Sequence, residues 1–345
     1  MLGKEGTDMI FLKNDYSLGA HPQVFQALAD QNLTPSDSYS NDTFCTETTQ
    51  LVRQITGQPD ADVHFIAGGT LTNLVCLAAF MCPYEAVIAA ESSHIYTHET
   101  GAIEATGHKV LPVPTTDGKV SPEDVDKVVA FHDMEQMVLP RVVYISDTTE
   151  MGAVYTLDEL KALRACCDRH GLYLYIDGAR LAMALGSSYN DVTLKDMAAL
   201  ADAFYFGGTK CGALFGEMVV IVNDTLKPHF RAIMRQNGAL FAKGMLLGIQ
   251  FQALLKDDLY TKLGRQADAM GQKLAHGIGA KGYEFAYTPV SNMIFPVMTR
   301  EKAAELAQNV MFEKWLDNAD GTQTIRFVTS WATTEDDIDG LLALL

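Results

Sequence analysis

The chain has few basic residues and no run of them. It contains 26 lysines and arginines against 43 aspartates and glutamates, which gives a formal net charge of −17 at pH 7. A surface that binds nucleic-acid phosphates or anionic lipid needs clustered positive charge. The composition therefore argues against a nucleic-acid-binding protein and against a membrane-surface protein.

Long apolar runs and paired cysteines are also missing. The longest strongly apolar stretch, Leu74 to Cys82, is far shorter than the ~20 residues that span a bilayer. The start of the chain, Met1 to Asp8, lacks the apolar segment of a secretion signal. None of the six cysteines forms a CxxC pair, which is typical of reduced thiols and offers no zinc pattern. We therefore expect a cytoplasmic protein without a membrane segment or a metal site.

What remains is the composition and pattern of a large α/β enzyme. Hydrophobic residues make up 48% of the 345 residues and charged residues 20%, as in ordinary globular proteins. Strand and helix patterns alternate along most of the chain, which predicts a mostly parallel sheet with helices on both faces. The expected strands lie at 63–67, 86–90, 142–145, 173–177 and 204–206, and helices are expected to start near Gly69, Ser121 and Thr156.

The pattern changes after Leu254. Helices near 260–280 and 302–312 then alternate with strands near 293–297 and 324–328, which predicts a second, smaller α+β domain. The expected organisation is an N-terminal segment at 1–14, a large domain at 15–254 and a small C-terminal domain at 255–345.

Two of the expected strands end in polar residues beside glycine. The strand at 173–177 ends in Asp177, and the strand at 204–206 leads through two glycines to Thr209 and Lys210. In an α/β protein such endings mark the carboxyl edge of the sheet, where ligands bind. A lysine and a carboxylate at that edge are what an enzyme using pyridoxal 5′-phosphate (PLP) requires. The lysine bonds the cofactor aldehyde as a Schiff base, and the carboxylate keeps the pyridine nitrogen protonated.

A glycine-rich turn after the strand at 63–67 is a candidate phosphate site. Gly68, Gly69 and Thr70 open a helix, and the free amides and dipole of a helix start favour an anion. The turn is not a Walker loop, because GxxxxGK[ST] is absent, and it is not a dinucleotide fingerprint, because GxGxxG is absent. A purely structural turn and a site for a single phosphate, such as that of PLP, both fit it.

Two histidines follow the strand at 86–90 and should lie at the same edge of the sheet. A histidine at such a place is often simply packed or exposed, but the flat ring of His94 also suits stacking on a pyridine ring. The spacing between His94 and His98 is one helical turn, which fits a metal pair as well. No third ligand completes that pattern, so we expect no metal.

Taken together, these motifs resemble the threonine aldolase branch of the β-eliminating lyase family, within the aspartate-aminotransferase fold group of PLP enzymes. The resemblance covers nearly the whole chain, and Asp-Gly-Ala-Arg-Leu at 177–181 followed by Lys210 is its most specific part. The matching segments are Asn14–Ser17, Tyr39–Asp42, Gly68–Thr70, Ser93–Ile95, Asp177–Leu181, Thr209–Lys210 and Ile325–Thr329.

The resemblance implies four roles around the cofactor ring. Lys210 is the Schiff-base lysine, and Asp177 pairs with the pyridine nitrogen. Arg180 lies near the ring oxygen. His94 stacks on the ring and is a candidate base for the substrate hydroxyl.

The resemblance also implies phosphate, substrate and partner contacts. Arg326 clamps the substrate carboxylate, the bidentate task that arginine performs best, and Asn14 bonds the substrate or the lysine. Tyr39 reaches a partner subunit's site and Arg235 the partner's phosphate, which implies a homodimer or homotetramer with sites at the subunit interface. The implied phosphate cup consists of Gly68, Gly69, Thr70 and Thr209.

The activity implied by the resemblance is cleavage of a β-hydroxy-α-amino acid, of the L-threonine or L-allo-threonine type, to glycine and an aldehyde. The chain departs from the family pattern at Asn14, where serine is usual, and at 208–211 and 147–150. These departures leave open threonine, allo-threonine, a bulkier β-hydroxy amino acid or a β-elimination substrate. The alternatives are a β-eliminating lyase that releases ammonia and a keto acid, a transaminase, and a binding module that has kept the fold.

Overall fold

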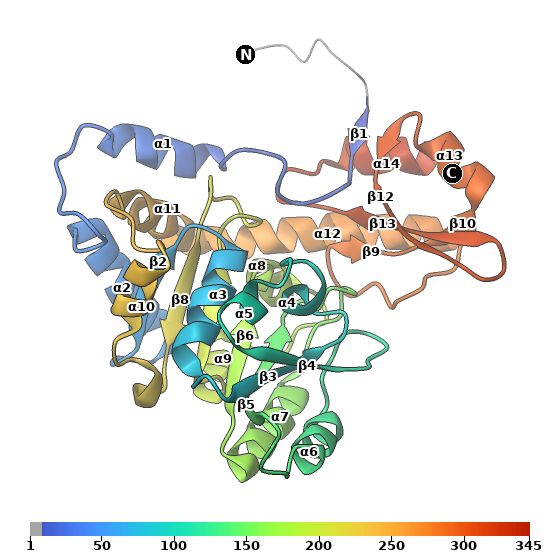
Figure 1. Ribbon diagram of the computed structural model, residues 1–345. Helices are drawn as coiled ribbons and strands as arrows, with labels where there is room; N and C mark the ends of the chain where they lie inside the picture. The colour runs from blue at the N-terminus through green and yellow to red at the C-terminus, as the bar shows by residue number, and fades with distance from the viewer. Residues whose placement is uncertain (1–8) are drawn as a thin grey trace.

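The computed structural model describes residues 9–345, which surround a seven-stranded sheet and a smaller C-terminal set of strands (Figure 1). The start of the chain, Met1 to Asp8, where no secretion signal is expected, lies outside the described residues. The strand order of the large sheet is β2-β8-β7-β6-β5-β3-β4. Its strands are β2 (Asp62–Ile66), β3 (Glu85–Ala90), β4 (Lys109–Val113), β5 (Leu139–Ser146), β6 (Tyr173–Asp177), β7 (Ala203–Gly207) and β8 (Glu217–Ile221).

The large sheet is mostly parallel, as predicted. The pairs β3–β4, β3–β5, β5–β6 and β6–β7 are parallel, whereas β8 runs antiparallel to both of its neighbours, β7 and β2. The parallel strands therefore deliver their carboxyl ends to one edge of the sheet. In the strand order, β6 lies between β5 and β7, so the residues that follow these three strands meet at that edge.

Helices cover both faces of this sheet (Figure 1), which confirms the predicted layering. Along β6, Leu174 and Ile176 belong to one buried apolar cluster and Tyr175 to another, because successive strand side chains point to opposite faces. The first cluster includes side chains from α2 (Thr43–Thr56), α6 (Pro122–Phe131), α7 (Leu157–His170), α9 (Leu194–Leu200) and α11 (Met245–Leu255). The second includes side chains from α3 (Gly69–Phe80), α5 (Ala102–Ala105) and α10 (Phe230–Gln236). The other helices before residue 259 are α1 (Pro22–Gln31), α4 (His94–Thr97), α8 (Leu181–Gly186) and the 3-10 helices η1 (Asp224–Leu226) and η2 (Lys256–Asp258).

Helix α7 shows how local sequence sets these elements. Thr156 caps its start by accepting from the Glu159 amide, and the Glu159 carboxylate accepts from the Thr156 amide in return. Leu160 and Leu163 recur at helical spacing and are buried against the sheet. Gly171 ends the helix in the left-handed conformation at φ 65°, which glycine adopts without steric cost. The helix start predicted at Thr156 is thus confirmed.

The C-terminal region forms a second, smaller α+β unit, as predicted. Its elements are α12 (Leu259–Ala280), β9 (Met293–Ile294), β10 (Val297–Thr299), α13 (Arg300–Leu306), β11 (Val310–Met311), β12 (Glu313–Asp317), β13 (Thr322–Val328) and α14 (Glu335–Leu344). Strand β13 pairs antiparallel with β9, β10 and β12. The helix predicted near 302–312 extends too far, because α13 ends at Leu306 in the structure. Residues 310–311 pair instead with β1 (Ile10–Phe11). This pairing brings the start of the described chain to the C-terminal region.

We propose that the large domain ends near residue 254, because α11 ends at Leu255 and the C-terminal strands follow α12. At 22 residues, α12 packs against α8 of the large part and α14 of the small part. Within residues 9–345, neither α12 nor another helix combines the length and apolar character needed to cross a membrane.

Glycines set the close contact between α8 and α12. A Cβ atom added to Gly264 would lie 1.7 Å from the Ala182 carbonyl oxygen, and one added to Gly186 would lie 2.4 Å from the Arg265 amide nitrogen. Both obstacles are backbone atoms, which cannot move aside as a flexible side chain can. The two helices approach this closely only because both positions lack a side chain.

We predict that Gly264→Ala destabilises the protein by at least about 2 kcal/mol, since overpacking a tight contact typically costs that much. The matched control is Gly279→Ala in the same helix, where the added Cβ would lie 3.7 Å from the Phe285 ring, an ordinary contact. There the better helix propensity of alanine should be neutral or stabilising, by up to about 1 kcal/mol. Thermal unfolding of the two variants checks this, and equal melting temperatures would contradict the packing argument.

Candidate active site

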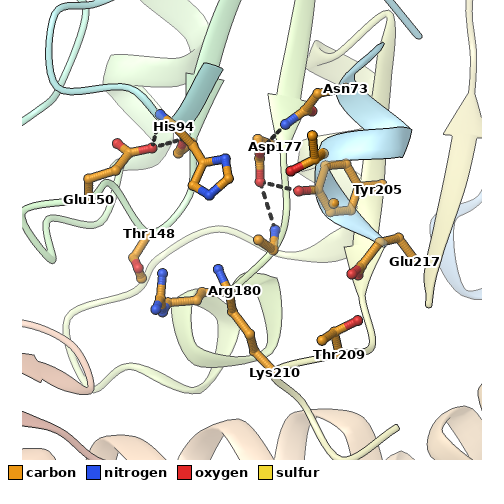
Figure 2. A pocket seen from close by; sticks show the side chains of 14 residues that line it. Asn73, His94, Thr148, Glu150, Asp177, Arg180, Tyr205, Thr209, Lys210 and Glu217 are labelled. Carbon is orange, nitrogen blue, oxygen red and sulfur yellow. Dashed lines mark hydrogen bonds between the residues drawn. The ribbon is translucent and has the colours of Figure 1, made fainter. Parts of the chain in front are cut away.

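A cavity of about 190 Å³ opens at the carboxyl edge of the large sheet (Figure 2). Residues from the ends of β5 and β6, from the loop after β7 and from the start of α3 line it. The cavity therefore lies where strand order and strand direction bring these segments together. The predicted site residues that line it are Gly69, Thr70, His94, Asp177, Arg180, Thr209 and Lys210.

Asp177 is a buried carboxylate that four donors hold ionised. Asn73 donates to Oδ2 at 2.9 Å, and the Ala179 amide donates to Oδ1 at 2.9 Å. The Tyr144 hydroxyl donates to Oδ2 and the Tyr205 hydroxyl to Oδ1, each at 2.5 Å. Burial alone would raise the pKa of Asp177, but these hydrogen bonds outweigh it and hold the pKa below its ordinary value. The cavity thus contains a fixed negative charge.

Lys210 enters the cavity from the loop after β7, on a turn that only glycine permits. A Cβ atom on Gly207 would lie 2.4 Å from the Ala179 carbonyl oxygen, and one on Gly208 would lie 2.5 Å from the Gly216 carbonyl oxygen. Burial lowers the pKa of Lys210, and the charge of Arg180 lowers it further. A lowered pKa increases the share of neutral amine, the form that attacks an aldehyde.

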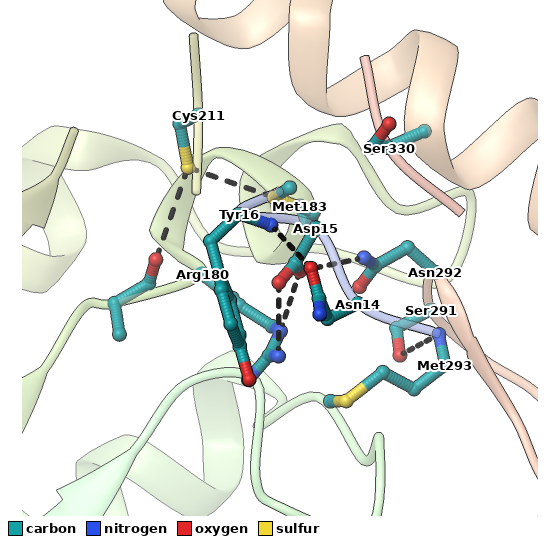
Figure 3. A network of polar contacts seen from close by, with 12 residues as sticks. Asn14, Asp15, Tyr16, Arg180, Met183, Cys211, Ser291, Asn292, Met293 and Ser330 are labelled. Carbon is teal, nitrogen blue, oxygen red and sulfur yellow. Dashed lines mark hydrogen bonds and ion pairs between the residues drawn. The ribbon is translucent and has the colours of Figure 1, made fainter. Parts of the chain in front are cut away.

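Arg180 is held in place by a part of the chain far from it in sequence (Figure 3). Its Nε donates to Asp15 Oδ2 at 2.8 Å and its Nη2 to Asp15 Oδ1 at 3.1 Å. The side-chain amide of Asn292 donates to Asp15 Oδ2 as well, at 3.1 Å. The buried Asp15 therefore links the N-terminal strand region, the cavity and the C-terminal unit.

Asn14 does not line the cavity, although the resemblance gives it a substrate contact. Its Oδ1 accepts from the Tyr16 amide at 3.1 Å and from the Ser17 hydroxyl at 2.8 Å. These local bonds stabilise a turn next to Asp15. Asn14 as a substrate residue stays a prediction.

His94 is joined to Asp177 through two buried polar side chains. Its Nδ1 lies 2.8 Å from Glu99 Oε1, the same oxygen that accepts from Asn73 at 2.9 Å. Asn73 in turn donates to Asp177. Because a carboxylate is an acceptor, the proton of this contact belongs to Nδ1, which leaves Nε2 as the acceptor nitrogen. The His98 ring stacks beside His94 with the ring centroids 5.6 Å apart.

Sequence reasoning did not assign roles to Asn73, Glu99, Tyr144 or Tyr205. A polar residue at an inward position of an apolar helix was the available signal for Asn73, which is fully buried in α3. Glu99 gave no comparable signal, because it lies in a polar loop and only the fold buries it to 6% exposure. The two tyrosines resemble ordinary strand core residues in the sequence.

The start of α3 supplies a cradle for an anion. In the described part of the chain no side chain caps its first turn, and Gly68 precedes it in an extended conformation. A Cβ atom on Gly68 would meet no atom within 4 Å, so the space above the turn is open. Thr70 from α3 and Thr209 from the β7 loop both line the cavity, and Thr209 Oγ1 accepts from the Gly216 amide at 3.0 Å.

Arg326 lies in β13 directly opposite Glu313 of β12, with which it forms an ion pair. Its guanidinium also lies 5.0 Å from the centre of the Trp315 ring. Arg326 Nε has no hydrogen-bond partner within residues 9–345 although it is buried, so one donor stays available. Arg326 is not among the residues that line the cavity.

Tyr39 and Arg235 lie together, and neither is among the residues that line the cavity of their own chain. The Arg235 guanidinium is 4.4 Å from the centre of the Tyr39 ring. The neighbouring Arg231 donates to the Tyr39 carbonyl at 2.9 Å, and Tyr39 has a left-handed backbone at φ 60°.

The residues of the cavity fit PLP. Asp177 is a buried carboxylate kept ionised, as a protonated pyridine nitrogen requires. Lys210 is an amine with a lowered pKa in the same cavity. The uncapped start of α3 offers free amides to a phosphate. The pyridine nitrogen, the aldehyde and the phosphate of the cofactor thus each have a counterpart among the residues of one cavity.

Comparison with known proteins gives a consistent picture. The beta-eliminating lyase family matches residues 21–301. A low specificity L-threonine aldolase of Pseudomonas aeruginosa is 31% identical over 330 residues, which cover 94% of this chain and 93% of that protein. A solved structure of a Leishmania major threonine aldolase has a TM-score of 0.96 at 46% identity, covering 97% of this chain and 98% of that one. An aspartate aminotransferase of Thermus thermophilus, at 15% identity over 99% of this chain and 92% of that one, has a TM-score of 0.72 and shares the fold.

Proposed function

The chain belongs to the beta-eliminating lyase family and is a PLP-dependent lyase, and from that premise we propose which bond it cleaves. The proposed reaction converts a β-hydroxy-α-amino acid, of the L-threonine or L-allo-threonine type, to glycine and an aldehyde. The observation that carries this proposal is the ionised Asp177 and the lysine Lys210 in one cavity. The similarity to threonine aldolases over nearly the whole chain supports the choice of substrate class.

When bound, PLP supplies an electron sink for the bond that breaks at the amino-acid α-carbon. In this proposal Lys210 would hold the cofactor through its aldehyde group, a place for which the substrate amine would compete. Asp177 holds a proton on the pyridine nitrogen, and its four hydrogen bonds fix it without movement during the reaction. Arg180, fixed by Asp15, binds the ring oxygen.

His94 is the proposed base for the substrate hydroxyl. Glu99 holds the proton of its Nδ1, so Nε2 is free to take the hydroxyl proton as the carbon–carbon bond breaks. A second carboxylate, Glu150, accepts from the His94 amide at 2.8 Å. His94 is thus held through both its backbone amide and its ring.

Arg326 is the proposed partner of the substrate carboxylate. Because Glu313 pairs with it, the substrate carboxylate has to share the guanidinium or displace Glu313. The unpartnered Nε offers one of the two donors of a bidentate contact. Asn14 is proposed to assist at the substrate or at Lys210.

We also propose that the working unit is a homodimer or homotetramer in the cytoplasm, with Tyr39 and Arg235 of one subunit serving the site of its neighbour. Two observations support this arrangement. Arg235 is exposed on its own chain, with its guanidinium over the Tyr39 ring, so a neighbouring subunit can reach it. Apolar side chains on and after α1 are exposed, with Phe25 at 61% and Leu33 at 91%, as expected of a surface that a second subunit covers.

Subunit mixing tests the shared site. We predict that Arg235→Ala and Lys210→Ala chains, each defective at limiting PLP, regain activity when refolded together. Only the mixed dimer contains an intact site, and random assortment gives up to about a quarter of wild-type activity. The control mixture of Arg326→Ala and Lys210→Ala should gain nothing, since both residues serve the same chain's site. Equal behaviour of the two mixtures would refute the proposed exchange of residues.

The substrate class is tested with a panel of L-threonine, L-allo-threonine, L-3-phenylserine and O-acetyl-L-serine. The proposal expects aldehyde release from the first three. A β-eliminating lyase, the alternative that the family description keeps open, would instead release ammonia and a keto acid, fastest from O-acetyl-L-serine. Ammonia as the main product across the panel would decide for that alternative.

A further inference from the structure

Glu217 is a buried carboxyl group in the cavity to which the proposed reaction gives no role. It is the first residue of β8 and is 3% exposed. Its Oε2 accepts from the Gly208 amide at 2.8 Å, next to the turn that carries Lys210. The side chain lines the cavity together with Thr70 and Thr209. A carboxyl group in a cofactor cavity requires an explanation, because burial disfavours its charge.

The covalent structure of PLP indicates which part of the cofactor meets Glu217. Asp177 and Lys210 define the axis from the ring nitrogen to the aldehyde carbon. The ring hydroxyl and the phosphate chain are attached on opposite sides of that axis. Figure 2 shows Arg180 and Thr148 on one side of Asp177, and Tyr205, Thr209 and Glu217 on the other.

Arg180 suits the ring oxygen, so the opposite side is left for the phosphate. The uncapped start of α3 lies on that side. A Cβ atom added to Gly69, its first residue, would lie 3.5 Å from the Tyr205 hydroxyl. Thr209 supplies a hydroxyl group on that side, and Thr70, which also lines the cavity, directly follows Gly69 in α3. Glu217 therefore lies among the hydrogen-bond donors of the phosphate subsite. A phosphate group requires donors there, and an ionised carboxylate would repel it.

The surroundings of Glu217 favour its neutral form. Burial raises its pKa to about 8, while Thr209, the Gly208 amide and the charge of Lys210 oppose that rise and the charge of Asp177 adds to it. The other titratable groups that face it are Tyr205, Cys211 and Tyr260, and each stays neutral because burial and nearby carboxylates raise its pKa. A phosphate dianion beside Glu217 would favour the proton further.

We propose that Glu217 is the neutral carboxyl group of the phosphate subsite, keeping its proton when PLP binds and donating it in a hydrogen bond to a phosphate oxygen. This inference rests on the proposed PLP chemistry of the site. Its consequence is that loading the cofactor takes up a proton at alkaline pH. Affinity for PLP therefore falls as pH rises through the titration of Glu217 in the empty protein, since the ionised form must first be protonated.

The test compares the dissociation constants of PLP and of pyridoxal, which lacks the phosphate, at pH 6.5 and pH 9.5. In the wild type, the affinity for PLP should fall about 30-fold more than the affinity for pyridoxal between the lower and the higher pH. This factor is expected for a group whose pKa lies about 1.5 units below the higher pH. The ring groups of the two ligands titrate alike, so the difference isolates the phosphate subsite. In Glu217→Gln, which keeps a donor that cannot ionise, this difference should vanish.

A second measurement uses the wild type alone and does not depend on the folding of a variant. In weakly buffered solution at pH 9, PLP should take up about one proton more than pyridoxal on binding. Equal proton uptake, or an unchanged pH dependence in a folded Glu217→Gln protein, would overturn the role of Glu217 while leaving PLP as the cofactor. Failure of PLP to bind even at pH 6.5 would overturn the proposed cofactor chemistry together with this inference.

Discussion

Lys210→Ala is expected to lower turnover at least about a thousandfold, or by about 4 kcal/mol in activation free energy, and to remove the adduct that borohydride traps between protein and PLP. Lys210 is the amine that enters the cavity holding Asp177, and its lowered pKa favours the neutral, bonding form. Loss of the amine removes both the attachment of the cofactor and the exchange with the substrate amine.

The measurement is peptide mapping of the borohydride-reduced protein together with a rate assay. Lys281→Ala serves as the control, since Lys281 is exposed at the end of α12 and does not line the cavity. That variant should keep both the adduct and the rate. An adduct mapped to any lysine other than Lys210 would rule out the assignment.

Asp177→Asn is expected to lower turnover at least about a hundredfold, about 2.7 kcal/mol. The amide carries no charge, so it cannot stabilise the protonated ring nitrogen that accepts electrons as the bond breaks. The tyrosine hydroxyl that faces the remaining side-chain oxygen can still donate to it, and the hydroxyl that faces the new NH2 group can turn and accept from it instead. The loss should appear mainly in kcat, because the negative charge matters most when electrons enter the ring.

Asp202→Asn is the matched control for this change. Asp202 is also a buried aspartate, with Arg164 donating to it at 2.6 Å, but it does not line the cavity. Its replacement should reduce stability and leave kcat close to that of the wild type. A folded, PLP-loaded Asp177→Asn protein with near-normal kcat would disprove the role of Asp177.

The parts of the site that depend on local pattern were predictable from the sequence. Asp177 ends a short strand and Lys210 follows one, each with glycine nearby, and the parallel sheet brings such endings to one edge. The helix start at Gly69 was predictable for the same reason. In each case the signal lies within a few residues of the feature.

The contacts between distant segments were not predictable in this way. The pairing of Arg180 with Asp15 joins residues 165 positions apart, and no local pattern encodes it. The same holds for Asn73, which bridges Glu99 and Asp177. Glu217 also escaped notice, because a single acidic residue at the start of a strand resembles a surface position until the fold buries it.

Tertiary pairing likewise decided the elements that the sequence misjudged. The helix predicted to continue to residue 312 ends at Leu306 because Val310 and Met311 pair with β1. The antiparallel direction of β8 was not predicted either, since its run of apolar residues fits a buried strand of either direction. That direction places Glu217, the first residue of β8, beside the carboxyl end of β7 and hence in the cavity.

The most direct test of the proposed reaction is a product analysis of the PLP-loaded protein with L-threonine as the sole substrate. We expect glycine and acetaldehyde in equal amounts, with formation of both lost in Lys210→Ala. Production of ammonia and 2-oxobutanoate instead, without glycine, would contradict carbon–carbon cleavage and assign the chain to β-elimination.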